Sequence, residues 1–316
     1  MKILILLALI VTVTFPAVTI CQEQSPNATL SWSVVQQLDG SRTPSGKFQD
    51  AVAVDLDSEG NIYIVDRARH RLVKYDQNFV FVKEIGGFGT GGEQFNDPRD
   101  VDAHLTLNIY VADYNNNRIV RFDGNLNYLN EFKSRAENNY YFEMPLSVGV
   151  SGQYDMFILE DLNRRIIKFD RFSEPQVAFG DNTENLGQLL NPHQLTVSEG
   201  GKIFVSDPAA KAVVVFDYLG NYAGEITHPD LQQPKGVSVA ADGTLLVCDS
   251  ETRQIFFFKN GQSFGGVLNV SGWGIKPQDV VMAVARKRTA RLLYVLSPQK
   301  CLILKPGVLD KSKPKP

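Results

Sequence analysis

Short apolar runs alternate with polar turns along most of the chain, and one pattern of runs recurs. The run IYIVD at residues 62–66 returns as IYVAD at residues 109–113, each time followed by a polar turn and a second apolar run. Four less similar copies follow. An acidic residue closes the first run in five copies and a serine in the sixth: Asp66, Asp113, Glu160, Asp207, Asp249 and Ser297. Their spacing of 42 to 48 residues indicates a repeat architecture.

Each copy divides into four short segments rich in β-branched and aromatic residues, which favour strands. In the second copy these segments are 100–103, 108–112, 118–122 and 128–132, separated by turn residues such as the run YNNN. No segment has the apolar spacing of an amphipathic helix. The sequence therefore predicts an all-β fold, a six-bladed β-propeller whose blades are four-stranded antiparallel sheets.

The two ends of the chain predict how the ring closes. The sixth copy supplies three strands and then stops at a proline and a glycine. A strand-like stretch at residues 30–38 precedes the first copy. We expect this N-terminal strand to become the outermost strand of the last blade, because that pairing removes the open edges of the ring. The propeller should then span residues 30–305, with a disordered Lys/Pro tail at 306–316.

The repeat resembles the NHL repeat. The resemblance is carried by the prolines that open most copies, by the run GNIYIVD at residues 60–66 and by RLVKYD at residues 71–76. It covers roughly residues 48–305 and is most specific in the first two copies. It implies a six-bladed ring and a range of possible functions, without selecting one.

The N-terminal residues predict that the protein is secreted. One lysine precedes an apolar stretch at residues 3–15 in which threonine is the only polar residue type, as in a secretory signal peptide. An uncleaved anchor is the alternative, although residues 3–20 are short for a membrane span. We expect a signal peptide at 1–21, an exposed leader at 22–29, and a secreted protein without stable membrane insertion. Two sequons are candidate glycosylation sites, Asn27 and Asn269.

Composition and short motifs limit the classes of partner and of chemistry that are expected. The net charge is −3, so no general affinity for nucleic acid is implied. Cys248 and Cys301 lie in neighbouring repeats, where either a disulfide or two buried thiols is possible. The nucleophile-elbow, zincin and paired-cysteine motifs are absent from the sequence. We expect a monomer with no cofactor.

The positions just after the repeated prolines should ring one mouth of the central channel. Several of them are polar or charged: Arg99, Asp100, His193, Lys235, Gln278 and Asp279. A concave mouth with convergent polar groups is where ligands bind, although solvated loops at a wide rim would give the same pattern.

The resemblance implies two candidate metal-dependent activities at these positions. The lyase that completes peptide amidation holds zinc with histidines at such places, but only His193 matches, and zinc needs three or four ligands. The calcium-dependent lactonases use channel carboxylates, to which Asp100 and Asp279 would contribute. Asp55 and Asp57 also fit the start of a calcium-binding loop, but the same span fits a β-hairpin, which we expect.

The sixth copy carries a basic insertion, ARKRTARL at residues 285–292, expected to project as a hairpin. It is either a docking site for a sulfated glycan or acidic partner, or a solvated loop. Its basic residues are Arg286, Lys287, Arg288 and Arg291. Taken together, the sequence favours a secreted binding or scaffold protein that recognises a protein, peptide or glycan. The alternative is a metal-dependent lyase or hydrolase centred on His193, Asp100 and Asp279.

Overall fold

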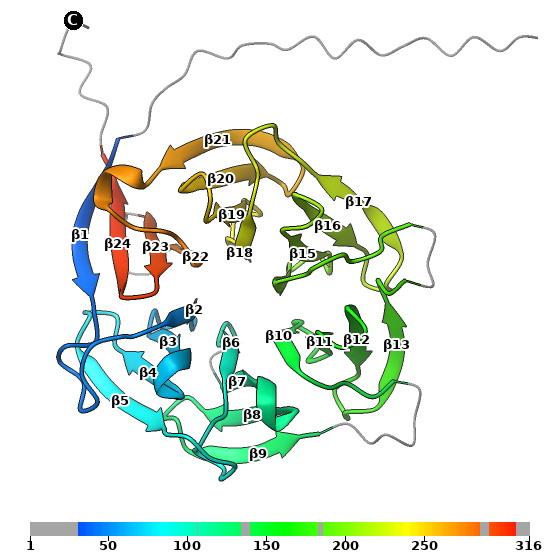
Figure 1. Cartoon of the computed structure of the whole chain (residues 1–316), viewed down its shortest axis with the longest axis horizontal. Helices are drawn as coiled ribbons and strands as arrows, with labels where there is room; N and C mark the ends of the chain where they lie inside the picture. Colours follow the sequence, from blue (N-terminus) through cyan, green and yellow to red (C-terminus); the bar gives the residue numbers. More distant parts are fainter. Residues whose placement is uncertain (1–30, 106, 134–139, 183–185, 285–290, 308–316) are drawn as a thin grey trace, which may run out of the picture.

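Six four-stranded antiparallel sheets surround a central channel as the blades of a propeller (Figure 1). The computed structural model describes residues 31–105, 107–133, 140–182, 186–284 and 291–307. In five of the blades the four strands follow one another in sequence, and the first of them lies nearest the channel. The predicted fold class is confirmed.

The strands follow the predicted segments closely. Blade one contains β2 (Ala51–Leu56), β3 (Ile62–Asp66), β4 (Arg71–Tyr75) and β5 (Phe81–Gly86). Blade two contains β6 (Pro98–Asp102), β7 (Asn108–Asp113), β8 (Arg118–Asp123) and β9 (Tyr128–Phe132). Blade three contains β10 (Pro145–Val150), β11 (Met156–Glu160), β12 (Arg165–Phe169) and β13 (Pro175–Phe179).

The remaining three blades repeat this order. Blade four contains β14 (Gln194–Val197), β15 (Ile203–Asp207), β16 (Ala212–Phe216) and β17 (Tyr222–Ile226). Blade five contains β18 (Pro234–Val239), β19 (Leu245–Asp249), β20 (Gln254–Lys259) and β21 (Ser263–Asn269). Blade six contains β22 (Asp279–Val284), β23 (Arg291–Ser297), β24 (Lys300–Pro306) and β1 (Trp32–Leu38).

Helical structure is confined, within the described ranges, to three short 3-10 turns. They are η1 (Arg67–Arg69), η2 (Tyr114–Asn116) and η3 (Ser271–Trp273). In the same part of the chain, no helix has the length and apolar character needed to cross a bilayer.

The ring closes through its N-terminal strand. β1 pairs antiparallel with β24, with Trp32 opposite Pro306 and Leu38 opposite Cys301. This is the pairing that the sequence predicts, and it places an early and a late segment of the chain in one sheet (Figure 1). Cys248 and Cys301 are both buried free thiols, so of the two alternatives for this pair the disulfide is wrong.

The core lies between neighbouring blades. All five residues of β3 are buried, as are those of its counterparts β11, β15 and β19. Between blades one and two, for example, Tyr63 and Leu72 pack in one apolar cluster with Val111 and Phe122. Each large side chain buried in this way contributes about 1.5–3 kcal/mol, so the contacts between blades hold the ring in a fixed circle.

The repeated acids at the ends of the second strands are structural. Asp249 accepts hydrogen bonds from the backbone amides of Glu251 and Thr252 in the following turn, at 2.9 and 2.8 Å. It also accepts from Gln232 and Gln233 in the loop that enters the blade, both at 2.6 Å. A carboxylate that satisfies several amides in this way fixes the loop and the turn together. The sequence pattern anticipated the contacts to the turn but not those to the incoming loop.

Candidate functional site

The channel has two different ends. The innermost strands lie side by side around it, so their first residues surround one end and their last residues the other (Figure 1). We call the first end the proline mouth, because the residues around it come directly after Pro98, Pro145, Pro192, Pro234 and Pro277 in the sequence. We call the other the turn mouth, since it is formed by the turns after the innermost strands, such as residues 55–60, 102–105 and 198–202.

Between the two mouths a set of polar side chains crosses the channel, and we call it the channel brace: Asp100, Ser147, Gln194 and Asp279. The amide nitrogen of Gln194 donates to Asp100 Oδ1 at 3.1 Å and to Asp279 Oδ2 at 3.2 Å. Ser147 Oγ donates to Asp100 Oδ2 and accepts from the backbone amide of Leu195 at 3.1 Å.

Backbone amides complete the brace. Asp279 Oδ2 accepts from Val54 N of blade one at 2.8 Å, and Gln194 Oε1 accepts from Val237 N of blade five at 2.7 Å. Each of the six blades therefore supplies at least one donor or acceptor. Gly236 permits this close approach, because a Cβ there would lie 2.4 Å from both the Cα and Oδ1 of Asp279.

Burial controls the charge of the brace. It raises the pKa of Asp100 to about 6, against the lowering effect of the hydrogen bonds from Ser147 and Gln194. Burial also raises the pKa of Asp279 well above its usual value, and the nearby Asp100 carboxylate raises it further. The structure thus brings Asp100 and Asp279 together as the sequence analysis required, but it links them through Gln194 instead of leaving a ligand position between them.

At the proline mouth, Arg99, Lys235 and Gln278 have internal partners, whereas the buried Nδ1 of His193 has no hydrogen-bond partner among the described residues. Arg99 forms an ion pair with Asp97 at 2.6 Å and lies over the ring of Tyr114, 4.4 Å from its centroid. Lys235 Nζ donates to Gln278 Oε1 at 2.8 Å. Burial and the nearby cations Lys235, Arg99 and Arg67 lower the pKa of His193 to about 3, so its imidazole is neutral. A ligand role for this mouth stays a prediction.

A cavity of about 1310 Å³ opens at the turn mouth, with the channel brace as its floor. All six blades line it, and valine and leucine supply most of the large apolar side chains of its walls. Its lining is rich in acids: Asp55, Asp57, Glu59, Asp100, Asp102, Glu199 and Asp279. The basic groups in the lining are His104 and Lys202. The volume exceeds that of a typical small-molecule pocket and is sufficient for a peptide segment.

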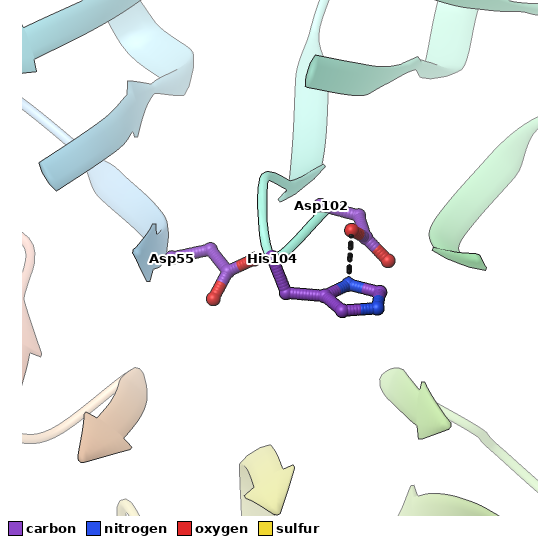
Figure 2. Close-up of side chains that lie close together, drawn as sticks. All are labelled: Asp55, Asp102 and His104. Carbon is purple, nitrogen blue, oxygen red and sulfur yellow. Dashed lines mark hydrogen bonds and ion pairs between the residues drawn. The ribbon is translucent and has the colours of Figure 1, made fainter. Parts of the chain in front are cut away.

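Three titratable side chains meet on one wall of this cavity (Figure 2). Asp55 belongs to β2, Asp102 ends β6 and His104 lies in the turn that follows. His104 Nδ1 lies 2.7 Å from Asp102 Oδ1. Asp102 Oδ2 accepts from Val150 N at 2.8 Å. Asp55 Oδ2 accepts from Ala103 N at 2.7 Å, so a backbone contact links blade one to blade two.

The electrostatics of this wall are perturbed. The Asp102 carboxylate raises the pKa of His104 to about 9, so the imidazole is protonated at neutral pH. Burial, with the charge of Asp102 as a second cause, raises the pKa of Asp55 to about 7. Such a concentration of shifted groups in a concave site is characteristic of functional positions.

The sequence analysis found part of this wall and missed the rest. The span that begins at Asp55 forms the β2–β3 hairpin, as expected, and Asp57 is used within it. The Asp57 carboxylate accepts from Glu59 N and Asn61 N, both at 2.9 Å. The sequence does not single out Asp102 and His104, because they lie at the end of an innermost strand, whereas the residues expected at the mouth lie at the starts of such strands. The signal in the sequence was the pair Asp102 and His104 at the end of one innermost strand, with Asp55 near the end of the neighbouring innermost strand.

The basic hairpin predicted at residues 285–292 is described only from Arg291 onward. Arg291 starts β23 and pairs with Asp242 at 2.7 Å. Arg286, Lys287 and Arg288 lie outside the described residues, as do Asn27, the signal peptide and the leader. The second sequon is described: Asn269 is exposed at the end of β21, and its Oδ1 accepts from Ser271 N at 2.9 Å.

Comparison with known proteins agrees with this architecture. Residues 95–122 match the family model of the NHL repeat. The chain is a β-propeller with an NHL repeat. No characterised protein sequence gives a significant match to the whole chain.

Among solved structures, this NHL-repeat propeller is similar to virginiamycin B lyase from Staphylococcus aureus, at 10% identity with a TM-score of 0.60. The match covers 87% of this chain and 99% of the lyase. A streptogramin B lyase gives a TM-score of 0.61 at 10% identity, over 87% of this chain and 98% of that one. A catalytically inactive histidine-to-alanine variant of the S. aureus lyase with quinupristin gives 0.59 at 10% identity, with coverage of 87% and 99%. At this identity the likeness shows the fold alone.

Proposed function

We propose that this propeller is a binding protein that takes a positively charged segment of a peptide or protein into the cavity of the turn mouth. The observation that supports this most directly is the cavity itself, about 1310 Å³ in volume and lined by more acidic than basic side chains. Low-dielectric walls around charges of one sign focus the electrostatic potential and attract ligands of the opposite sign.

The arrangement of the acids suits such a ligand. Glu59 and Glu199 are exposed in the lining, where they attract an approaching cation, while the valine-rich walls pack against its apolar parts. The channel brace closes the floor, so a ligand enters and leaves by the same mouth. The net charge of the whole chain is only −3, so the attraction comes from this local grouping.

A peptide selection tests the proposal. The purified protein is used to enrich binders from a random peptide display library, and the enriched peptides are measured by fluorescence anisotropy. We expect Lys- and Arg-rich sequences whose affinity falls as salt is raised. Glu199→Lys should weaken their binding about tenfold or more, since one nearby charge is worth on the order of 1–3 kcal/mol in a concave site.

The matched control is Glu251→Lys, which makes the same charge change on an exposed residue in the turn after β19, away from the cavity lining. It should bind the selected peptides as the unmodified protein does. Equal loss in both variants, or enriched peptides with no basic residues, would show that the turn mouth is not the binding site.

A metal-dependent lyase or hydrolase is the second candidate, favoured by one observation: Asp55, Asp102 and His104 converge on the cavity wall. The similar structures are lyases, although the likeness extends to the fold only. Incubation with virginiamycin B, followed by chromatography and fragmentation mass spectrometry, tests this candidate. A product that forms with the unmodified protein and not with His104→Ala would replace the binding proposal with an enzymatic one.

We also propose that the protein is secreted as a monomer and carries glycans at Asn27 and Asn269. The exposure of the Asn269 side chain supports glycosylation at that residue. Expression in a eukaryotic secretory host should give a protein in the medium whose N-terminus is Gln22 and whose mass falls after glycosidase treatment. Recovery in the membrane fraction with Met1 retained would contradict cleavage.

A further inference from the structure

We propose that Asp55, Asp102 and His104 form a binding site for one divalent transition-metal ion, such as Zn²⁺, on the cavity wall at the turn mouth. This site goes beyond the proposed peptide binding and does not depend on it. The three residues come from neighbouring blades and meet because β2 and β6 lie side by side (Figure 2).

The spacing of the ligand atoms suits one ion. One atom from each side chain can be chosen so that all three lie within 4.8 Å of one another. Tetrahedral ligands at about 2.0–2.2 Å from a zinc ion lie about 3.3–3.6 Å from each other, so rotations of the three side chains would have to bring the ligand atoms closer together. The two carboxylates are already held, since Asp55 Oδ2 accepts from Ala103 N and Asp102 Oδ2 from Val150 N. Hydrogen bonds of this kind orient metal ligands in proteins.

The charge of the cluster also favours binding of a cation. Asp102 is about nine-tenths buried and already pairs with His104, so the second carboxylate, Asp55, has no basic side chain of its own in the cluster. Asp55 is half-buried in the cavity wall, and a bound divalent ion would stabilise the charged form of its carboxylate. Metal binding would release to solvent the proton that His104 Nδ1 shares with Asp102.

The donor set selects the type of metal. One imidazole nitrogen with two carboxylates suits Zn²⁺ or Mn²⁺, whereas Ca²⁺ requires six to eight oxygen ligands. Three protein ligands leave at least one position open toward the cavity. A ligand or water molecule in the cavity could occupy that position.

Calorimetric titration of the full, chelator-stripped protein with ZnCl₂ tests the site. We expect one zinc ion per chain, and at least a tenfold loss of affinity in Asp55→Asn and in His104→Gln. Zinc should also raise the melting temperature of the unmodified protein, because it binds the folded state.

Two controls make the result specific. Glu251→Gln removes one exposed acidic charge outside the cavity lining, and His228→Gln removes a histidine outside the cluster. Both should bind zinc as the unmodified protein does. Absence of stoichiometric zinc binding, or unchanged binding by Asp55→Asn and His104→Gln, would overturn the proposal. Equal loss in all four variants would show nonspecific attraction and overturn it as well. The peptide measurements are made in EDTA, so either proposal can fail without the other.

Discussion

Replacing Gln194 with leucine is expected to destabilise the whole propeller, because this side chain joins three blades to its own across the channel. Its amide donates to Asp100 and Asp279 and accepts from Val237 N at 2.7 Å. Leucine has a similar volume and forms none of these bonds. A buried amide left without an acceptor costs about 1–3 kcal/mol. Each lost bond to a carboxyl group costs a further ~0.5–1.5 kcal/mol, so we expect a total loss of about 2–6 kcal/mol.

Urea unfolding followed by circular dichroism measures this loss. The control is Gln176→Leu, which changes an exposed glutamine of β13 bonded only to Asp170 and Glu174. Exposed substitutions of this kind are usually within about 0.5 kcal/mol of the unmodified protein. If Gln194→Leu also unfolds within 1 kcal/mol of it, at an unchanged m-value, the brace does not stabilise the ring and our reasoning about the channel is wrong.

Three further predictions concern pH, closure and the repeated acids. The pKa of Asp100 rises to about 6 in the folded state, so between about pH 4 and 6 the folded protein binds more protons than the unfolded chain. The stability of the protein should therefore fall as pH rises through this range. Asp100→Asn should reduce the fall in melting temperature between about pH 4.5 and 7. Deleting residues 31–38 removes β1 and the stacking of Trp32 on Phe257, so calorimetry should show a broader unfolding transition at a lower temperature. An unchanged transition would mean that the ring closes without this strand. Asp249→Ala leaves four backbone amides without their acceptor and should cost about 2–4 kcal/mol in urea unfolding, against less than about 0.5 for the exposed Asp230→Ala.

The sequence predicted the ring well because the signals for it are local and repeated. The run at 62–66 and its copies combine strand-forming residues with an acid that caps a turn, and each copy constrains the interpretation of the others. Closure by β1 followed from counting strands. The sequence could not show the channel brace or the cluster on the cavity wall, because both join residues from different blades. Asp100 and Asp279 are 179 positions apart in the sequence, and only the circular arrangement brings them to one glutamine.

The two mouths differ in how their charges are used, and this difference decides where ligand binding is expected. At the proline mouth, Arg99 is paired with Asp97 and Lys235 with Gln278, so a ligand that binds either cation must displace an existing partner. At the turn mouth, the acids of the lining outnumber the basic groups and attract a cation, which at Asp102 would replace the proton that His104 shares. Desolvating a charge that already has a partner gives little net affinity, whereas neutralising an unpaired one inside a concave site gives more. The same argument applies to a basic peptide and to a metal ion, and it is why we propose both for the end of the channel where Asp55 and Asp102 lie.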